Sequence, residues 1–483
     1  MIAPKRLAIA LVALFAVRLI AGAVLPLSAD EAYYWLWSKH LAAGYYDHPP
    51  AIAFLIAAGT ALFGKTALGV RLFGILLSFA ATGLVWQSAA ILLKDKAAGI
   101  RAALLFNATL MVTVEMMAAT PDTPQVFTAA AFLWTLAKLV ETGNGRWWLA
   151  VGVAGGLGLL SKYSTLFLGL GALVWFLANP VARRWLVSPW PYLGAVLAGV
   201  IFLPNIVWNA DHGWATVAFQ FGRIAGHQLT LKYLGELIGA EAVLASPFVL
   251  ILGLMGIAAA RRRDPAESLV AALIWPSIAY FLIHALHDRV QGNWPCYLFP
   301  AFILAALAAA RRDWTGWKAV LVARSARLAL PVALVLVVAG YAQALIGVVP
   351  MGRKDPLARL LAVGMPLVVR DLGELKTANH AERIITTDYA STGWFAFYSP
   401  YPVVSLGEDM RWPNSAPLTA ADFTHPALYI TEDRRDLHAL VATRFTSVSE
   451  IARIDRMRGD IAIAHYVVYR VSGPKGSDLG RMP

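Results

Sequence analysis

Charged residues are scarce in this chain of 483 residues, at 14% of the total, whereas an average soluble domain has about 25%. Hydrophobic residues make up 59%. Cys296 is the single cysteine, which excludes an intrachain disulfide. Neither a Cys/His zinc pattern nor a Walker-type phosphate loop occurs in the sequence. The composition therefore predicts a polytopic α-helical membrane protein.

Apolar runs that could cross a membrane recur along the first 350 residues. There are eleven candidates, at residues 7–27, 67–93, 102–118, 123–140, 147–160, 164–179, 187–204, 237–258, 268–285, 296–310 and 328–349. Beyond Pro350, short β-rich runs such as ERIITTDY, YPVVSL, ALYITED and IAHYVVYRV alternate with helical stretches such as DLHALVATRF. We expect a transmembrane domain at residues 1–350 and a small α/β domain at residues 351–483.

Lysine and arginine predict the orientation, because they favour cytoplasmic loops. With a cytoplasmic N-terminus, the inner segments hold 16 of these residues and the outer segments only Lys39, Lys65, Lys162, Arg223, Lys232 and Arg289. An odd number of spans then places residues 351–483 outside, as a periplasmic domain. The net charge of +12 divides into +11 for residues 1–350 and +1 for the remainder. The high pI therefore reflects membrane orientation, and no nucleic-acid partner is expected.

A polar stretch, SADEAYYWLWSKHLAAGYYDHPP, follows the first span on the predicted outer side. Its aromatic residues suit a helix at the membrane interface over residues 32–41, where tyrosine and tryptophan rings form a belt. A belt does not account for Asp30 and Glu31 at the membrane edge, nor for Asp47 and His48 before two prolines.

More polar side chains fall on the same predicted face. Ionisable groups at membrane depth are costly and usually mark function. The outer face therefore predicts a reaction or binding centre, to which the following residues belong: Arg71, Asp122, Lys162, Arg223, Arg289 and Asn293.

The order of these motifs resembles the GT-C glycosyltransferases of the protein O-mannosyltransferase and lipid A aminoarabinose transferase type. The resemblance covers about residues 1–310, and the motifs DEAYYWLW, GYYDHPP, GVRL, TPD, LSKYS and NWP are most similar to a bacterial branch that includes lipopolysaccharide galacturonosyltransferases. It implies an inverting glycosyltransferase of the bacterial inner membrane, which moves a sugar from a polyprenyl-phosphate-linked donor. The implied acceptor is lipid A, lipopolysaccharide core, another glycan or a protein on the periplasmic face.

Displacing a phosphate from an anomeric carbon requires a base for the acceptor's proton and cations for the leaving phosphate. By resemblance, Asp30 is the candidate base, with an interface cap or an ion-paired structural role as the alternative. Lys162 is a candidate phosphate ligand, or a snorkelling lysine at a helix end. Asp122 either orients the acceptor or sugar, or caps the following helix.

Further cations complete the candidate donor-phosphate site. His48 stands where the aminoarabinose transferases carry lysine, and it either contacts the phosphate or packs beside Pro49. Arg71 either clamps the phosphate or anchors a helix end. Arg223 and Arg289 are assigned to the same group.

Glu31 is the third candidate catalytic carboxylate, and it either holds the loop by hydrogen bonds or helps to bind a divalent ion. No cofactor is expected, since no cluster of carboxylates with metal-ligand spacing supports a divalent cation. The candidate contacts to sugar or acceptor are Tyr45, Tyr46, Asp47 and Asn293, although a place in the headgroup belt is favoured for the two tyrosines.

Two other functions share some of these features: a transporter or flippase of lipid-linked sugars, and an oligosaccharide ligase with pyrophosphate-linked donors. Transporters often contain inverted repeats and charges at the bilayer midplane. No repeat is evident, and the charges gather at one face. In the C-terminal domain, Asp388, Tyr389 and the run WFAFY either touch the glycan or the membrane surface or lie in a core strand or helix, and the second alternative is favoured. The domain is expected to select or position the acceptor.

Overall fold

The computed structural model describes residues 4–222 and 229–483, and the chain divides into two compact units. The first unit contains the residues up to Gly22, then His48–Ile52 and Arg71–Gly340. The second unit contains Ala23–Asp47, Ala53–Val70 and Tyr341–Pro483. Most of the polar stretch after the first helix therefore belongs to the same unit as the C-terminal residues.

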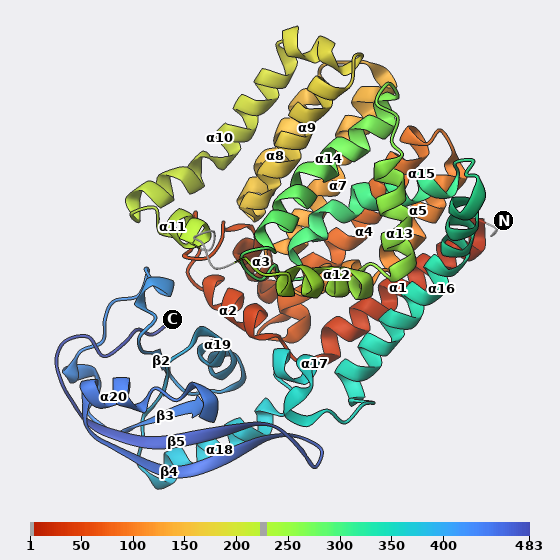
Figure 1. Cartoon of the computed structure of the whole chain (residues 1–483). Helices are drawn as coiled ribbons and strands as arrows, with labels where there is room; N and C mark the ends of the chain where they lie inside the picture. The colour runs from red at the N-terminus through yellow and green to blue at the C-terminus, as the bar shows by residue number, and fades with distance from the viewer. Residues whose placement is uncertain (1–3, 223–228) are drawn as a thin grey trace. The chain divides into compact units, whose positions relative to one another are not determined.

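The first unit is built of α-helices (Figure 1). Helix α8 packs against α7 and α10, and α9 packs against α14. The helices that lie wholly or mostly in this unit are α1 (Pro4–Val24), α4 (Ala67–Leu92), α5 (Lys96–Ala108), α6 (Leu110–Glu115), α7 (Asp122–Thr142), α8 (Trp147–Ser161), α9 (Leu166–Ala178), α10 (Trp190–Asp211), α11 (Ala215–Gly222), α12 (Lys232–Leu244), α13 (Pro247–Ala258), α14 (Pro265–His284), α15 (Phe299–Ala310) and α16 (Gly316–Ile346), with the 3-10 segments η1 (Tyr163–Thr165), η2 (Ala182–Val187) and η3 (Trp294–Leu298).

Among the described residues, four helices are long and apolar enough to cross a membrane, namely α4, α10, α14 and α16. Helices α12 and α13 form a fifth candidate if they are taken together, although they are bent by 107° at the break between them. Shorter apolar helices include α8 and α15. Helical structure occurs in each of the eleven predicted stretches, but a count of eleven spans is not confirmed.

Two of the predicted spans are interrupted. Helix α5 ends before Thr109, whose extended backbone and side-chain oxygen cap α6 through the N–H of Val112. Between α12 and α13, Ser246 has a φ of 73° and caps the second helix, with Pro247 at its first position. Serine and threonine side chains that bind nearby backbone groups compete with a continuous helix, and proline begins a new one.

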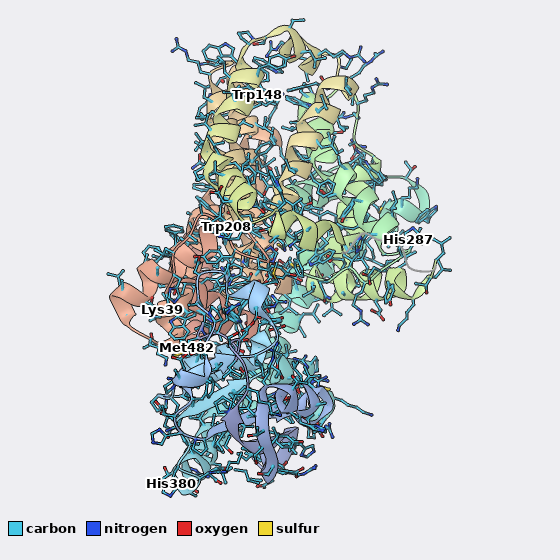
Figure 2. The ribbon with its side chains drawn as sticks, turned by 90° about the vertical axis from the view of Figure 1, so that its left-hand side faces the viewer. Lys39, Trp148, Trp208, His287, His380 and Met482 are labelled. Atoms are coloured by element: carbon cyan, nitrogen blue, oxygen red, sulfur yellow. The ribbon has the colours of Figure 1, made fainter. Side chains whose placement is uncertain are left out.

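Close helix packing in the first unit depends on glycine. A Cβ added to Gly152 on α8 would lie 2.2 Å from the carbonyl oxygen of Gly194 on α10, so the two backbones touch. Gly152 and Gly156 form a GxxxG motif on α8, and it is a packing motif, because small residues let membrane helices approach closely. Trp148 and Trp208, from the first turn of α8 and the last turn of α10, lie toward opposite ends of this pair (Figure 2).

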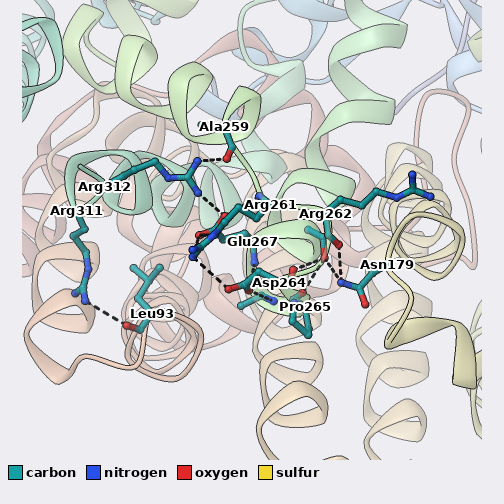
Figure 3. Close-up of polar contacts among 12 residues, drawn as sticks. Leu93, Asn179, Ala259, Arg261, Arg262, Asp264, Pro265, Glu267, Arg311 and Arg312 are labelled. Carbon is teal, nitrogen blue, oxygen red and sulfur yellow. Dashed lines mark hydrogen bonds and ion pairs between the residues drawn. The ribbon is translucent and has the colours of Figure 1, made fainter. Parts of the chain in front are cut away.

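Connecting segments that the sequence assigns to the inner side meet in the first unit (Figure 3). Glu267, in the first turn of α14, pairs with Arg261 and with Arg312, each at 2.6 Å. The side-chain amide of Asn179 donates to the carbonyl oxygen of Arg262 at 2.9 Å. Several of the basic residues that indicate the orientation are therefore also used in loop-to-loop contacts.

The second unit has a five-stranded mixed sheet in the order β2-β1-β3-β5-β4. Strands β2, β1 and β3 are parallel, and β5 is antiparallel to both β3 and β4. Its elements are α2 (Ala29–Trp37), α3 (Ala51–Phe63), α17 (Pro356–Leu360), α18 (Met365–Ala378), α19 (Tyr389–Tyr398), α20 (His438–Arg444), β1 (Arg383–Thr386), β2 (Val403–Ser405), β3 (Ala427–Glu432), β4 (Phe445–Arg458) and β5 (Ile461–Pro474), with the 3-10 segments η4 (Gly352–Lys354), η5 (Asp409–Arg411), η6 (Ala420–Asp422) and η7 (Asp433–Arg435).

Two expectations for the polar stretch and the residues directly after it are corrected. Helix α2 begins three residues before the predicted start, and Tyr33, Tyr34, Trp35 and Trp37 are all buried in the protein, so they do not form an exposed membrane belt. Helix α3 was not among the predicted apolar spans. Its apolar run of 13 residues is shorter than the roughly 20 needed to span a bilayer, which is why the sequence did not mark it as a span.

Candidate active site

A buried ion pair joins two of the candidate residues in the first unit. Asp122 is the first residue of α7, and Lys162 follows the last turn of α8 with an extended backbone. The Lys162 Nζ lies 2.6 Å from Asp122 Oδ1, and the two side chains are only 13% and 4% exposed. The structure thus brings together a carboxylate and a cation that lie 40 residues apart in the sequence.

Both oxygens of Asp122 accept further hydrogen bonds. The amide Nδ2 of Asn293 donates to Oδ2 at 2.8 Å, and the thiol of Cys296 donates to Oδ1 at 3.2 Å. Because the side chain is used in this way, the prediction that Asp122 caps α7 is wrong, and Pro121 before it provides no side-chain cap either. Cys296 was not predicted at the site, and its apolar surroundings in the sequence gave no signal for it.

Arg71 and His48 are two further candidate cations of the first unit. Arg71 is almost fully buried, and its Nη1 donates to the carbonyl oxygen of Gly22, near the end of α1, at 3.0 Å. This contact fits the helix anchor that the sequence offered as an alternative, and a phosphate contact stays a prediction. His48 is half-buried in the loop before α3, ahead of two buried prolines.

Arg289 lies on an exposed part of the first unit, in the loop after α14. Its guanidinium pairs with Glu236 on α12, with Nε 2.7 Å from Oε2, and the two side chains are 53% and 36% exposed. This ion pair is separate from the Asp122 cluster. Arg223, which was also predicted at the donor-phosphate site, lies outside the described residues.

In the second unit, Asp30 and Glu31 occupy the first turn of α2. Glu31 is buried and forms a capping box with Ser28: its Oε2 accepts the Ser28 N–H at 2.8 Å, and its own N–H donates to the Ser28 hydroxyl at 3.2 Å. This geometry fits the loop-holding alternative for Glu31. Asp30 instead accepts a hydrogen bond from the Tyr389 hydroxyl, at 3.2 Å from Oδ1.

Asp47 is also buried and holds a partner from far along the chain. Its Oδ2 forms an ion pair with Arg411, a residue that no motif in the sequence marked. The guanidinium of Arg411 lies 5.5 Å from the centre of the Tyr46 ring. Asp47 and Tyr46 therefore belong to a cluster with Arg411, in the same unit as Asp30.

Tyr45 is packed inside the protein, and its contact with sugar or acceptor stays a prediction. It is buried, and its ring stacks on that of Trp37 with the centres 4.3 Å apart. Its hydroxyl lies 3.1 Å and 3.0 Å from the carbonyl oxygens of Trp37 and His40, and burial raises its pKa to about 12. Tyr45 therefore stabilises the loop through its hydroxyl contacts, and the prediction that it lies in the headgroup belt is wrong.

The described residues contain no group of three or more histidine, cysteine, aspartate or glutamate side chains arranged to hold a metal ion. The divalent cation that the sequence left open for Glu31 gains no ligand set from the residues of this structure.

Comparison with known proteins finds similarity to sugar transferases of the type that the motifs resemble. Residues 47–208 match the family described as dolichyl-phosphate-mannose-protein mannosyltransferase. The sequence is 26% identical to lipid A galacturonosyltransferase RgtD of Rhizobium johnstonii, over 74% of this chain and 72% of that protein. The undecaprenyl phosphate-alpha-4-amino-4-deoxy-L-arabinose arabinosyl transferase of Pseudomonas aeruginosa is 24% identical over 56% of this chain. The chain spans about half, 51%, of that relative's length.

The fold is shared with solved structures of sugar transferases. The crystal structure of ArnT from Cupriavidus metallidurans bound to undecaprenyl phosphate has a TM-score of 0.63, covering 98% of this chain and all of that one, at 16% identity. Arabinofuranosyltransferase AftD from Mycobacteria has a TM-score of 0.51 over 98% of this chain and 40% of its own, also at 16% identity. The resemblance to the GT-C glycosyltransferases is confirmed, and the fold is of that type.

Proposed function

We propose that this protein is an inverting glycosyltransferase that moves a sugar from a polyprenyl-monophosphate carrier to an acceptor at the periplasmic face of the bacterial inner membrane. One observation carries the proposal. The segment that matches the mannosyltransferase family supplies both Asp122 and Lys162, and their side chains meet in a buried ion pair. A buried cation of this kind is suited to a phosphate, which leaves with negative charge.

Lys162 contributes positive charge at the donor phosphate. An ammonium group has three N–H donors, and its hydrogen bond to Asp122 uses one of them. The carboxylate of Asp122 is already occupied, because Lys162, Asn293 and Cys296 all donate hydrogen bonds to it. Its role is therefore to hold Lys162 and Asn293 in place, and Asn293 contacts sugar or acceptor through the same cluster.

Asp30 acts as the general base. It takes the proton of the acceptor hydroxyl while the acceptor oxygen forms a bond to the anomeric carbon of the sugar. The bond between that carbon and the phosphate oxygen breaks, and its electron pair stays with the polyprenyl phosphate. Attack from the side opposite the phosphate inverts the configuration of the anomeric carbon. The leaving phosphate needs no proton, so a single base is sufficient.

The named relatives favour a lipid A or lipopolysaccharide core acceptor over a protein, since they include transferases for lipid A and for the core. They also favour group transfer over transport, because the curated relatives that match this chain are described as transferases. The C-terminal residues of the second unit lie on the periplasmic side in this proposal, where they select the acceptor.

The lipid that accompanies the purified protein tests the proposal. The protein is extracted in mild detergent, and its bound lipids are identified by mass spectrometry. A polyprenyl monophosphate, with or without a sugar, is the expected lipid, and Lys162→Ala should lower its recovery relative to a Glu236→Gln control. Recovery of a polyprenyl pyrophosphate oligosaccharide instead would support the ligase alternative and contradict the proposal.

A further inference from the structure

Two carboxylates of the N-terminal polar stretch are held by side chains from the C-terminal part of the chain. Within the second unit, the Tyr389 hydroxyl donates to Asp30 Oδ1 at 3.2 Å, and Arg411 pairs with Asp47. Tyr389 and Arg411 also touch each other, because the guanidinium lies 4.5 Å from the centre of the Tyr389 ring. The four side chains form one connected group, which we call the Tyr389–Arg411 brace.

The helices that carry this group are in close contact. Asp388 caps α19 by accepting the N–H of Ser391 at 3.0 Å, which sets Tyr389 at the first helical position. Further along α19, a Cβ added to Gly393 would lie 2.9 Å from the backbone nitrogen of Tyr33 on α2. The absence of a side chain at Gly393 therefore allows the two helices to approach until the Tyr389 hydroxyl reaches Asp30.

Aromatic rings surround the group and limit its movement. The ring of Tyr33 lies with its centre 5.0 Å from that of Tyr389 and 5.4 Å from that of Trp412. The Arg411 guanidinium lies 5.5 Å from the centre of the Tyr33 ring, at cation–π distance. A side chain that packs against aromatic rings and pairs with a charge loses rotamer freedom, so it presents its polar atom in one position.

The charges in the group keep both donors protonated. The charge of Asp30 and then burial raise the pKa of Tyr389 above its ordinary value, so the hydroxyl remains a hydrogen-bond donor. Burial by itself lowers the pKa of Arg411, but Asp47 and Tyr33 more than offset this and raise it, so the guanidinium remains charged.

We propose that Tyr389 and Arg411 are positioning residues for glycosyl transfer, which orient Asp30 for proton abstraction and hold Asp47 in place through its ion pair with Arg411. The inference rests on the proposed function, with Asp30 as the base. A hydrogen bond to Oδ1 fixes the rotation of the Asp30 carboxylate and thus the direction in which Oδ2 is presented. The C-terminal part of the chain is then part of the catalytic machinery, in addition to any role in acceptor selection.

A pair of tyrosine variants tests the inference with one matched control. Tyr389→Phe removes only the hydroxyl on Asp30, while Tyr469→Phe removes a hydroxyl that donates to another carboxylate of the same unit, Asp436 Oδ2, at 2.5 Å. Misplacing a catalytic group by about 1 Å costs up to about 100-fold in rate. We therefore expect Tyr389→Phe to lower kcat about 10- to 100-fold, with the donor KM within about 2-fold of the wild type. Tyr469→Phe should leave both values within about 2-fold.

Arg411→Lys provides a second variant, because it keeps the charge beside Asp47 and loses the planar contact with Tyr389. A fall in kcat of about 10-fold, with little change in the donor KM, is expected for it too. Unfolding temperatures in detergent are measured for all three variants. If Tyr389→Phe lowers the unfolding temperature well below that of Tyr469→Phe and its remaining folded fraction has full kcat, the contact is a structural brace and the inference is overturned.

The same assay separates failure of the inference from failure of the proposed function. If the wild type transfers sugar from a polyprenyl-monophosphate donor and Tyr389→Phe matches Tyr469→Phe in kcat, the positioning role is wrong and the function stands. If the wild type releases no polyprenyl phosphate from that donor, the proposed function fails and the inference fails with it.

Discussion

Removing one partner of the Asp122–Lys162 pair should destabilise the first unit strongly. At 2.6 Å and an effective dielectric constant of about 20, the attraction between the charges is about 6 kcal/mol. Desolvation of each ion costs several kcal/mol, so in the intact pair the attraction and the desolvation cost nearly cancel. A single remaining ion keeps its desolvation cost without the attraction, and this asymmetry sets the size of the effect.

We therefore expect Asp122→Asn and Lys162→Met each to lower the free energy of unfolding by about 3–5 kcal/mol. The double variant should lose less than the sum of the two, by a coupling energy of about 1–3 kcal/mol, because it leaves no unpaired charge. The exposed pair Arg289–Glu236 is the matched control, and Glu236→Gln should cost about 1 kcal/mol or less.

Denaturant unfolding of the purified proteins in detergent measures these differences, and turnover is measured in parallel. Additive losses in the Asp122→Asn/Lys162→Met double variant would show that the two charges do not interact, which would refute the reasoning. The double variant should also be folded but inactive, because it lacks the Lys162 cation. Normal turnover in the double variant would remove Lys162 from the donor-phosphate site.

Three other outcomes are expected. Asp30→Asn should lower kcat by about 100- to 10,000-fold with donor binding retained, and activity within a few-fold of wild type would place the base elsewhere. In steady-state assays, His48→Lys should retain substantial activity whereas His48→Ala loses it, and equal losses would make His48 a packing residue. A reporter fused after Pro483 should give a periplasmic signal and one fused after Asp264 a cytoplasmic signal, because lysine and arginine favour inner loops; a cytoplasmic C-terminus would contradict the predicted orientation.

Much of the fold is predictable from sequence because apolar runs and β-rich runs have direct physical causes. Strands β1, β2, β3 and β5 were all predicted, since each is a run of buried β-branched or aromatic residues. Strand β4 was missed, because it pairs on one side only, with β5, and carries many charged, exposed residues. The breaks at Thr109 and Ser246 depend on local capping, which hydropathy does not register.

The site was predicted residue by residue, but its connections were not. The motifs marked Asp122, Lys162 and Asn293, and the structure joins them in one cluster. Nothing in the sequence pointed to Arg411, because its partner Asp47 lies 364 residues away. Tyr389 was expected in the core, and only the packing of α19 on α2 shows that its hydroxyl reaches Asp30.

The central claim is sugar transfer from a monophosphate carrier, and one measurement tests it most directly. The purified full-length protein, reconstituted in vesicles of bacterial phospholipid with lipid A as acceptor, is given the same sugar on undecaprenyl monophosphate or on undecaprenyl pyrophosphate. Mass spectrometry follows the free carrier, the glycosylated acceptor and the anomeric configuration of the product. Our account predicts glycosylated acceptor, an equal amount of free undecaprenyl monophosphate and inverted configuration from the first donor alone. Use of the pyrophosphate donor alone, or movement of an intact donor across the vesicle membrane without a glycosylated product, would contradict it.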